Sequence, residues 1–304
     1  MPIPHSQLET WSNPGPTISS SNTYQSIRNA LEHSNSPILD RIKSKEIKIY
    51  LQGSYANDTN IRGDSDVDIV VEHTGAFHSN KNDLSYSELQ LHEQTYGSAS
   101  YGFYDLRNDV IKALQLYFGN AFVDTTGNKS IKILPNNGRL RADVVPVISY
   151  RKYSYFNGIY DHGKEVGVSF NHKTTNKTIF NFPEHHYQNG VTKHDDTKKL
   201  FKPTVRIFKN AVSYLVDNGK LQKGVAPSYF LQCMVYNVPS NLFESDLTVT
   251  FCNVVNHLHS VNFSTLVCQH EMHPLFGTDD TYWNEVDARV TLDALIKLWN
   301  EWYA

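Results

Sequence analysis

Two aspartates at alternate positions, Asp66 and Asp68, precede an apolar run in the stretch GSYANDTNIRGDSDVDIVV, residues 53–71. Because side chains alternate across a strand, both carboxylates are expected on one side, with Val67, Ile69 and Val71 facing a core on the other. Two carboxylates a few ångströms apart repel each other, and they stay ionised when a cation lies between them. Hard oxygen ligands suit Mg²⁺ or Mn²⁺, which take further ligands from water and substrate phosphates. The pair predicts a metal site for phosphoryl transfer.

Two further features favour this interpretation. Gly53 and Ser54 follow a predicted strand, where backbone N–H groups and a hydroxyl can hold a phosphate. Asp143 lies in the otherwise apolar stretch RADVVPVI, where a lone carboxylate is costly unless it is paired or bound to metal. Three carboxylates can hold two metal ions about 3.5–4 Å apart and activate a hydroxyl against a nucleotide's α-phosphate. The alternative is a turn, because RGDSD is also typical of aspartates that cap backbone amides.

The elements that must position these residues follow from periodicity. Residues 1–20 are rich in Pro, Ser, Thr and Asn and predict a loose arm, followed by a helix-like pattern from residue 23 to about 45. The first half then mixes strands and helices, including an amphipathic helix closed by Gly119, and the second half is mostly helical. The pattern predicts an α+β fold, with a core domain and N-terminal helix over residues 1–195 and a helical domain over 196–304.

Composition restricts the classes of protein. The chain has 304 residues, 39% hydrophobic residues and a net charge of -3, without a long Lys/Arg block. We therefore expect no strong nucleic-acid binding. No run approaches the ~18 apolar residues of a membrane span, and the N-terminus lacks the pattern of a secretory signal. Three cysteines without CxxC spacing fit a reducing compartment, so we expect a cytoplasmic protein without a membrane partner.

At these residues the sequence resembles the polymerase-β-type nucleotidyltransferase core. The Gly-Ser pair, then Thr-x-Ile-Arg-Gly-x-Ser-Asp-x-Asp, with RADVVPVI downstream, is most similar to the oligoadenylate synthetase and cyclic GMP–AMP synthase branch. Bacterial members of that branch, the CD-NTases, make cyclic oligonucleotide signals in anti-phage defence. The resemblance implies that Asp66 and Asp68 are the metal pair and that Asp64 belongs to the loop. It also implies that Asp143 is the third carboxylate, which accepts the proton of the attacking hydroxyl.

The resemblance extends into the helical half. The stretch TVRIFKNAVSYL resembles the helix whose basic side chains reach the triphosphate, which implies Arg206 and Lys209, with Lys202 on the same face. The stretch APSYFLQCMVYN resembles the segment whose tyrosine stacks on a nucleobase, which implies Tyr229. A solvated basic face and plain core packing are the alternatives for these two stretches.

The sequence departs from the animal cyclic GMP–AMP synthases, because their zinc-binding insertion is missing. A histidine-rich stretch later in the chain has no zinc spacing that we can justify, and its members are interpreted as ordinary surface and core residues: His257, His259, Cys268, His270 and His273. In some bacterial relatives a terminal small residue is joined to a partner protein. Ala304 is small, so such conjugation is a hypothesis beside that of an ordinary terminus.

The implied activity is a metal-dependent nucleotidyltransferase that joins NTPs into a small cyclic oligonucleotide and releases pyrophosphate. ATP is an expected substrate, and GTP or a pyrimidine NTP is an open alternative. Only a local basic cluster is present, enough for one or two nucleotides and not for a growing strand: Lys198, Lys199, Lys202, Arg206 and Lys209. The alternatives are an enzyme that makes linear oligonucleotides or modifies RNA ends, and a non-catalytic nucleotide-binding module.

Overall fold

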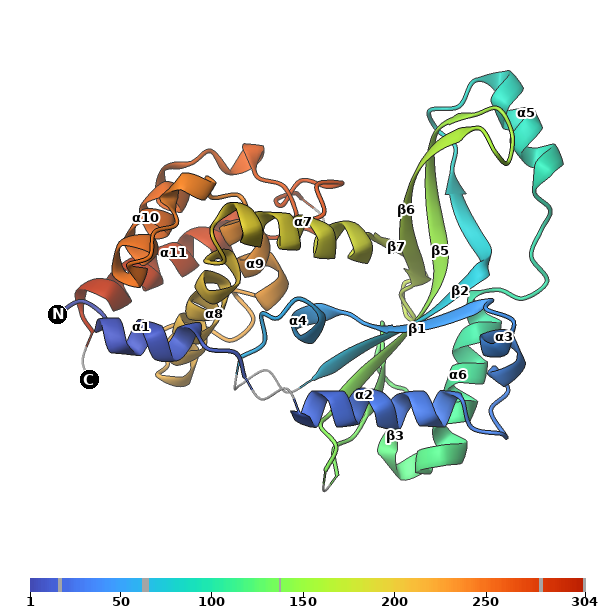
Figure 1. Cartoon of the computed structure of the whole chain (residues 1–304), viewed down its shortest axis with the longest axis horizontal. Helices are drawn as coiled ribbons and strands as arrows, with labels where there is room; N and C mark the ends of the chain where they lie inside the picture. The colour runs from blue at the N-terminus through green and yellow to red at the C-terminus, as the bar shows by residue number, and fades with distance from the viewer. Residues whose placement is uncertain (16–17, 62–65, 137, 279–280, 303–304) are drawn as a thin grey trace. The chain divides into compact units, whose positions relative to one another are not determined.

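The computed structural model describes residues 1–15, 18–61, 66–136, 138–278 and 281–302. Its chain forms two compact units, each built from several stretches (Figure 1). The sheet unit contains residues 18–52 and 65–183, and the helical unit contains residues 1–17, 53–64 and 184–304. Asp64 and Ala304, which carried the loop assignment and the conjugation hypothesis, lie outside the described residues.

In the described part of the sheet unit, seven strands form one mixed sheet in the order β1-β2-β5-β4-β3, with β6 between β5 and β7. The pair β2·β5 is parallel and the other pairs are antiparallel. The strands are β1 (Ile47–Leu51), β2 (Val67–Asn80), β3 (Val123–Asp124), β4 (Ile131–Ile133), β5 (Ala142–Phe156), β6 (His162–Asn171) and β7 (Thr178–Asn181).

Two long helices pack on one face of this sheet, as Figure 1 shows for α2 (Ile18–Leu31) and α6 (Phe103–Phe118). Phe103 of α6 lies in one apolar cluster with Ile148 of β5, so the helices cover the face that also carries Ala142 and Val144. The helix α6 ends at Gly119, whose φ of 82° is left-handed, as the sequence predicted. The shorter helices of this unit are α3 (Leu39–Lys43) and α5 (Tyr86–Thr95).

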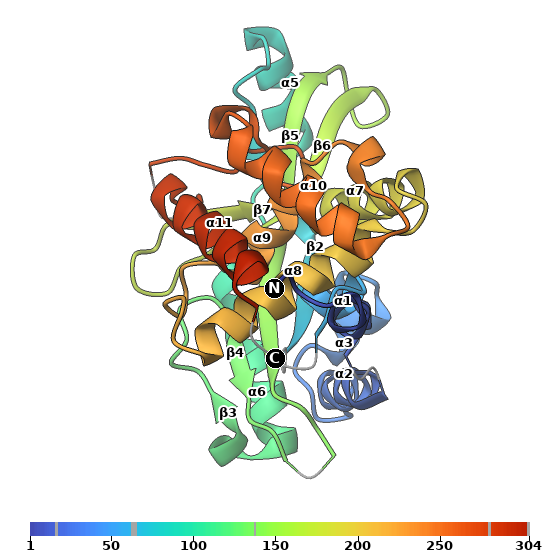
Figure 2. The ribbon, with the colours of Figure 1, turned by 90° about the vertical axis from the view of Figure 1, so that its left-hand side faces the viewer.

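The helical unit is a bundle around one apolar core (Figure 2). Its helix α8 buries Val205, Phe208, Val212 and Leu215, spaced three and four residues apart, which is the spacing of one helix face. The helices of this unit are α1 (His5–Ser12), α4 (Gly53–Ala56), α7 (Pro183–Asp196), α8 (Phe201–Asp217), α9 (Ser228–Tyr236), α10 (Leu247–Ser260) and α11 (Glu285–Asn300). Single 3₁₀ turns cover Asn120–Phe122 in the sheet unit and Ser240–Leu242 and Phe263–Thr265 here.

The predicted α+β class, with a sheet core followed by a helical C-terminal part, is confirmed. The predicted loose arm over residues 1–20 is wrong, because α1 forms there and places Leu8 and Trp11 in the helical core. The Trp11 ring lies 5.5 Å from the ring of Trp302 and 6.0 Å from that of Tyr214. The domain boundary predicted at residue 195 stays a prediction.

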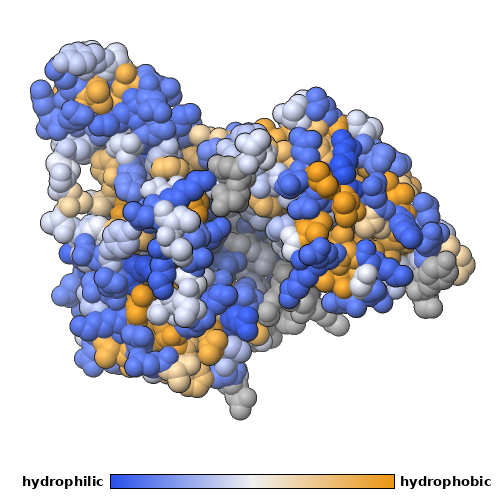
Figure 3. Space-filling view, turned by 180° about the vertical axis from the view of Figure 1, so that it is seen from behind, coloured by the Kyte–Doolittle hydropathy of each residue, from blue (hydrophilic) through white to orange (hydrophobic). Residues whose placement is uncertain are grey.

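The surface seen from behind carries mostly hydrophilic residues, with apolar residues interspersed among them on both units (Figure 3). Among the helices in the described residues, none is long and apolar enough to cross a membrane.

The core position of α1 predicts that Leu8→Ala lowers the free energy of unfolding by about 2–5 kcal/mol, because a fully buried leucine leaves a cavity when it is truncated. Urea unfolding measures the loss. The control Glu9→Gln changes an exposed neighbour on the same helix and should stay within about 0.5 kcal/mol. Equal, small effects of both variants would mean that α1 does not contribute to the core.

Candidate active site

The sheet unit brings two of the three predicted carboxylates together. Asp68 of β2 and Asp143 of β5 are directly paired in the parallel register, so their side chains lie side by side on one face. Asp66 precedes Asp68 by two residues and therefore belongs to the same face. Val67 and Ile69 are fully buried on the opposite face, as the alternating pattern predicted.

Neighbouring groups on this carboxylate face act on Asp143 in both directions. Burial, and then the charge of Asp66, raise the pKa of Asp143, while Lys132 and Ser130 act in the other direction. Lys132 of β4 is paired with Asp143 in the register. The Nε of Arg141 lies 3.9 Å from Oδ1 of Asp66, a partly exposed ion pair that stabilises little. Among the described residues, the buried Oδ1 of Asp143 has no hydrogen-bond partner.

These residues fit a hard divalent cation. An unpartnered carboxylate oxygen beside further carboxylates is the donor chemistry that Mg²⁺ and Mn²⁺ prefer, with water and substrate phosphates as the remaining ligands. Within the described residues, no three Asp, Glu, His or Cys side chains already form a complete metal cage. In the histidine-rich stretch, His259 is exposed and Cys268 and His270 are buried.

The predicted phosphate-binding pair lies in a compact loop of the helical unit, which we call the 53–61 segment. Gly53 has a left-handed φ of 69° and begins the single turn α4. The Asn57 side chain donates to the Gly53 carbonyl at 2.8 Å, and the Thr59 N–H donates to the Ser54 carbonyl at 2.9 Å. These bonds give the segment a defined backbone shape around Ser54.

The basic residues of α8 contact this segment directly. Arg206 is 6% exposed and donates from Nε to the Ser12 carbonyl at 2.6 Å and from Nη1 to the Asp58 carbonyl at 2.5 Å. Lys209 is 3% exposed and donates from Nζ to the Thr59 carbonyl at 2.9 Å. Lys202, on the same helix, is half-buried. The triphosphate role of the three side chains stays a prediction.

Tyr229 is partly exposed and stacks on His186, with ring centroids 5.4 Å apart and planes 22° apart. Its nucleobase role stays a prediction. A polar group beneath it was not predicted from the sequence. In this group, Gln232 of α9 donates to Nε2 of His186 and to Oε1 of Gln269, each at 3.0 Å. Gln232 also accepts a 2.9 Å hydrogen bond from the Thr59 hydroxyl. A single glutamine in the apolar stretch SYFLQCMVY was the available signal.

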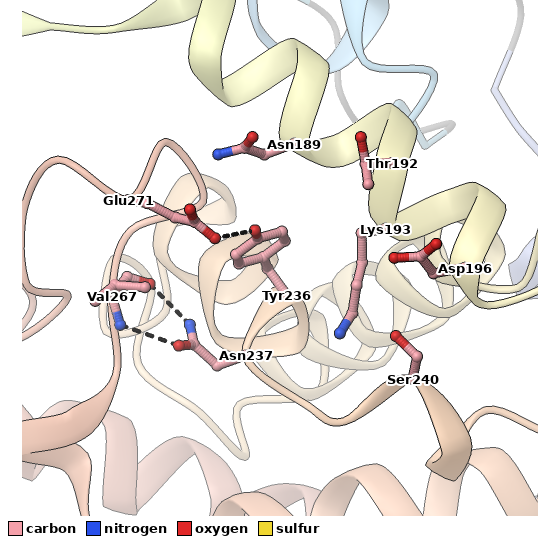
Figure 4. A pocket seen from close by; sticks show the side chains of 9 residues that line it. All are labelled: Asn189, Thr192, Lys193, Asp196, Tyr236, Asn237, Ser240, Val267 and Glu271. Carbon is pink, nitrogen blue, oxygen red and sulfur yellow. Dashed lines mark hydrogen bonds between the residues drawn. The ribbon is translucent and has the colours of Figure 1, made fainter.

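A separate polar pocket of about 490 Å³ lies in the helical unit (Figure 4). The Tyr236 hydroxyl donates to Glu271 at 2.5 Å, and the Lys193 ammonium donates to the Val238 carbonyl at 2.5 Å. The residues that line the pocket are Asn189, Thr192, Lys193, Asp196, Tyr236, Asn237, Ser240, Val267 and Glu271. Its two carboxylates and single, already bonded ammonium do not suit a triphosphate, and the predicted nucleotide-binding residues are absent from this lining.

Comparison with known proteins identifies the family of this chain. Residues 188–300 match the cGAS/DncV-like nucleotidyltransferase C-terminal helical domain, and residues 36–109 match a nucleotidyltransferase domain. The chain is 39% identical over 306 residues to the cyclic nucleotide synthase CdnE01 of Staphylococcus haemolyticus, covering 99% of this chain and 100% of that one. It is 40% identical over 302 residues to a cyclic UMP-AMP synthase of Rhodothermus marinus (strain SG0.5JP17-172), covering 99% of each.

Solved structures show the same likeness. The Rhodothermus marinus CdnE c-UMP-AMP synthase with Apcpp and Upnpp has a TM-score of 0.87 at 38% identity, covering 100% of this chain and 98% of that chain. The Elizabethkingia meningoseptica CdnE cyclic dinucleotide synthase with GTP and Apcpp has a TM-score of 0.75 at 30% identity, covering 98% of each chain.

The fold and the matched models define a metal-dependent nucleotidyltransferase. The chain belongs to the cGAS/DncV-like nucleotidyltransferases, the CD-NTases, and among them to the CdnE-type cyclic nucleotide synthases. The predicted family and enzyme class are confirmed. The relatives support a cyclic product formed from NTPs, and they do not support the linear alternative.

Replacing the Asp143 carboxylate by a neutral amide should stabilise the fold. In metal-free buffer, we expect Asp143→Asn to raise the free energy of unfolding by up to about 1 kcal/mol, because the neutral amide removes a charge that burial and Asp66 disfavour. Urea unfolding measures the gain, and Asp83→Asn in the exposed loop before α5 is the matched control. A loss of stability would mean that the contacts with Lys132 and Ser130 outweigh the repulsion.

The buried histidine beneath Tyr229 predicts a pH dependence. Burial, and then the charge of His270, lower the pKa of His186 to about 3, so the folded protein keeps this ring neutral. The unfolded chain takes up a proton below pH ~6.5, so stability falls as the pH drops from there toward 3, by at most about 1.4 kcal/mol per pH unit from this group. Urea unfolding at pH 7, 6 and 5 should give a flatter profile for His186→Gln. Equal slopes for both proteins would contradict the assignment.

Proposed function

We propose that this enzyme joins ATP and UTP into a cyclic dinucleotide second messenger in the bacterial cytoplasm, with Mg²⁺ (or Mn²⁺) as its metal and anti-phage signalling as its role. The observation that carries the chemistry is the in-register pair Asp68 and Asp143, with a buried Oδ1 of Asp143 that has no hydrogen-bond partner among the described residues. The nucleotide pair is supported by the 40% identity, over 99% of each chain, to a relative named cyclic UMP-AMP synthase.

In this proposal Asp66, Asp68 and Asp143 hold the metal, which when bound supplies positive charge for the attacking hydroxyl and the leaving pyrophosphate. Gly53 and Ser54 hold the donor triphosphate through backbone N–H groups and the hydroxyl. Arg206 and Lys209 of α8 add positive charge for the triphosphate, and Lys202 joins them on the same helix. The Tyr229 ring offers its exposed part to a nucleobase, while its stacking on His186 fixes its orientation.

Asp143 is the proposed proton acceptor, and its place beside Asp68 in the register puts its carboxylate at the proposed metal site. A ribose hydroxyl of the acceptor nucleotide attacks the α-phosphorus of the donor, and the bond from that phosphorus to pyrophosphate breaks. The hydroxyl proton goes to the Asp143 carboxylate. A second transfer of the same kind, between the remaining hydroxyl and triphosphate, closes the ring and releases a second pyrophosphate.

Incubation of the purified chain with labelled NTP pairs and Mg²⁺, followed by phosphatase, tests the proposal. ATP with UTP should give a phosphatase-resistant product, whose mass identifies a cyclic dinucleotide of AMP and UMP. Asp68→Asn should lower the rate by at least about 100-fold because it removes a metal ligand, and the exposed control Asp83→Asn should not. A resistant product from another NTP pair alone would contradict the substrate assignment, and near wild-type rates of Asp68→Asn would contradict the metal site.

A further inference from the structure

Two of the three cysteines lie together in the helical unit. Cys233 is on α9, and Cys268 is in the loop that follows the 3₁₀ turn Phe263–Thr265. Both are buried and free. The Gln269 N–H, directly after Cys268, donates to Sγ of Cys233 at 3.3 Å, and the two thiols are hydrogen-bonded to each other. A disulfide therefore needs only a closer approach of two sulfur atoms that are already in contact, to about 2.05 Å.

The loop that carries Cys268 is fixed beside α9. The side chain of Asn237, at the end of this helix, donates to the Val267 carbonyl at 2.7 Å and accepts from the Val267 N–H at 3.0 Å. One residue further on, the Cys268 N–H donates to the His273 carbonyl at 2.9 Å and closes the loop. Cys268 therefore faces α9 from a defined backbone position.

The surroundings of Cys268 favour its thiolate. The Met272 N–H donates to Nδ1 of His270 at 3.0 Å, which assigns the ring proton of the neutral His270 to Nε2. Hydrogen bonds from Cys233, and then from His270, lower the pKa of Cys268 although burial acts against them. Burial raises the pKa of Cys233. One thiol is thus suited to attack an oxidant, and the other remains a thiol until the first has reacted.

We propose that Cys268 and Cys233 form a peroxide-sensitive pair, which closes to a disulfide and is reopened by a dithiol reductant. The Cys268 thiolate attacks one oxygen of hydrogen peroxide, the O–O bond breaks, and the other oxygen leaves as hydroxide and takes up a proton to become water. The Cys233 sulfur then attacks the sulfenic acid at Cys268, the S–O bond breaks, and a second water leaves with the Cys233 proton. Two thiols lose two electrons, and one peroxide is reduced to two waters.

The disulfide acts on the tyrosine that is proposed to bind a nucleobase. The Tyr229 hydroxyl is hydrogen-bonded to both thiols, and Tyr229 precedes Cys233 by four residues on α9. Oxidation removes both thiol protons and draws Cys233 toward Cys268, so the hydroxyl loses partners that fix the ring. We expect the oxidised protein to bind nucleotide more weakly, a consequence that rests on the proposed role of Tyr229.

Thiol counting in the purified, reduced full chain tests the pair without nucleotide. After a small molar excess of hydrogen peroxide, alkylation in denaturant should label one cysteine in place of three, and peptide mapping should show a disulfide between Cys233 and Cys268. Dithiothreitol should restore all three labels. The matched control is Cys252→Ser, which removes the half-buried cysteine of α10 and should leave the disulfide unchanged.

Single variants separate the two steps. Cys233→Ala removes the second thiol, so Cys268 should remain a sulfenic acid that dimedone labels after peroxide. Cys268→Ala should give no dimedone label at Cys233, because burial keeps that thiol protonated. If either variant does not fold, the peptide map of the wild-type chain still decides whether the disulfide forms.

Kinetics give the second readout. With an NTP pair that the enzyme uses, oxidation of the wild type should raise KM by about fivefold or more, and dithiothreitol should reverse the change. The double variant Cys233→Ala, Cys268→Ala should show no peroxide-dependent change in KM.

Three labelled cysteines after peroxide, or a disulfide that includes Cys252, would overturn the inference. A reversible disulfide between Cys233 and Cys268 with an unchanged KM would support the thiol pair and count only against the role of Tyr229. Because thiol counting needs no nucleotide, its result stands even if the enzyme turns out to use other substrates.

Discussion

The parallel pairing of β2 and β5 is the constraint on which the chemistry of the sheet unit depends, because it places Asp68 beside Asp143. Parallel neighbours cannot be joined by a tight turn, so the chain makes a long crossover through α5 and α6. The helix α6 packs against the face that bears Ile148, opposite the carboxylates. The same crossover that permits the pairing therefore builds the core and keeps the two like charges off the apolar side.

The spacing of apolar residues was enough to predict the class of fold. These residues occupy alternate positions 67, 69 and 71 in β2, and they recur every three to four positions in α8. Composition misled at the N-terminus, where a polar and proline-rich stretch hides Leu8 and Trp11, three residues apart on α1. The strand β2 continues to Asn80, although its sequence becomes polar after His73, because β5 supplies backbone partners across the bulge that follows. Because the partner strand lies far away in the chain, the local sequence does not show that this polar part of β2 forms a strand.

The candidate site also contains residues that could be predicted from the sequence and contacts that could not. Asp66, Asp68 and Asp143 stand out from sequence because carboxylates beside apolar strand residues need a chemical reason. The contacts of Arg206 and Lys209 were beyond such reasoning, since their acceptors are carbonyls of residues about 150 positions earlier, and any residue type can supply a carbonyl. Charge on a helix face indicates that an acceptor exists, and only the folded backbone shows which carbonyls lie within its reach.

The interleaving of the two units limits how such enzymes can be recombined. The chain passes from one unit to the other at residues 17/18, 52/53, 64/65 and 183/184. A chimaera of two homologues joined at a single junction after residue 183 would combine the 53–61 segment of one parent with the α8 and α9 of the other. A chimaera that is meant to carry the substrate preference of one relative should therefore take the 53–61 segment and the C-terminal helices from the same parent.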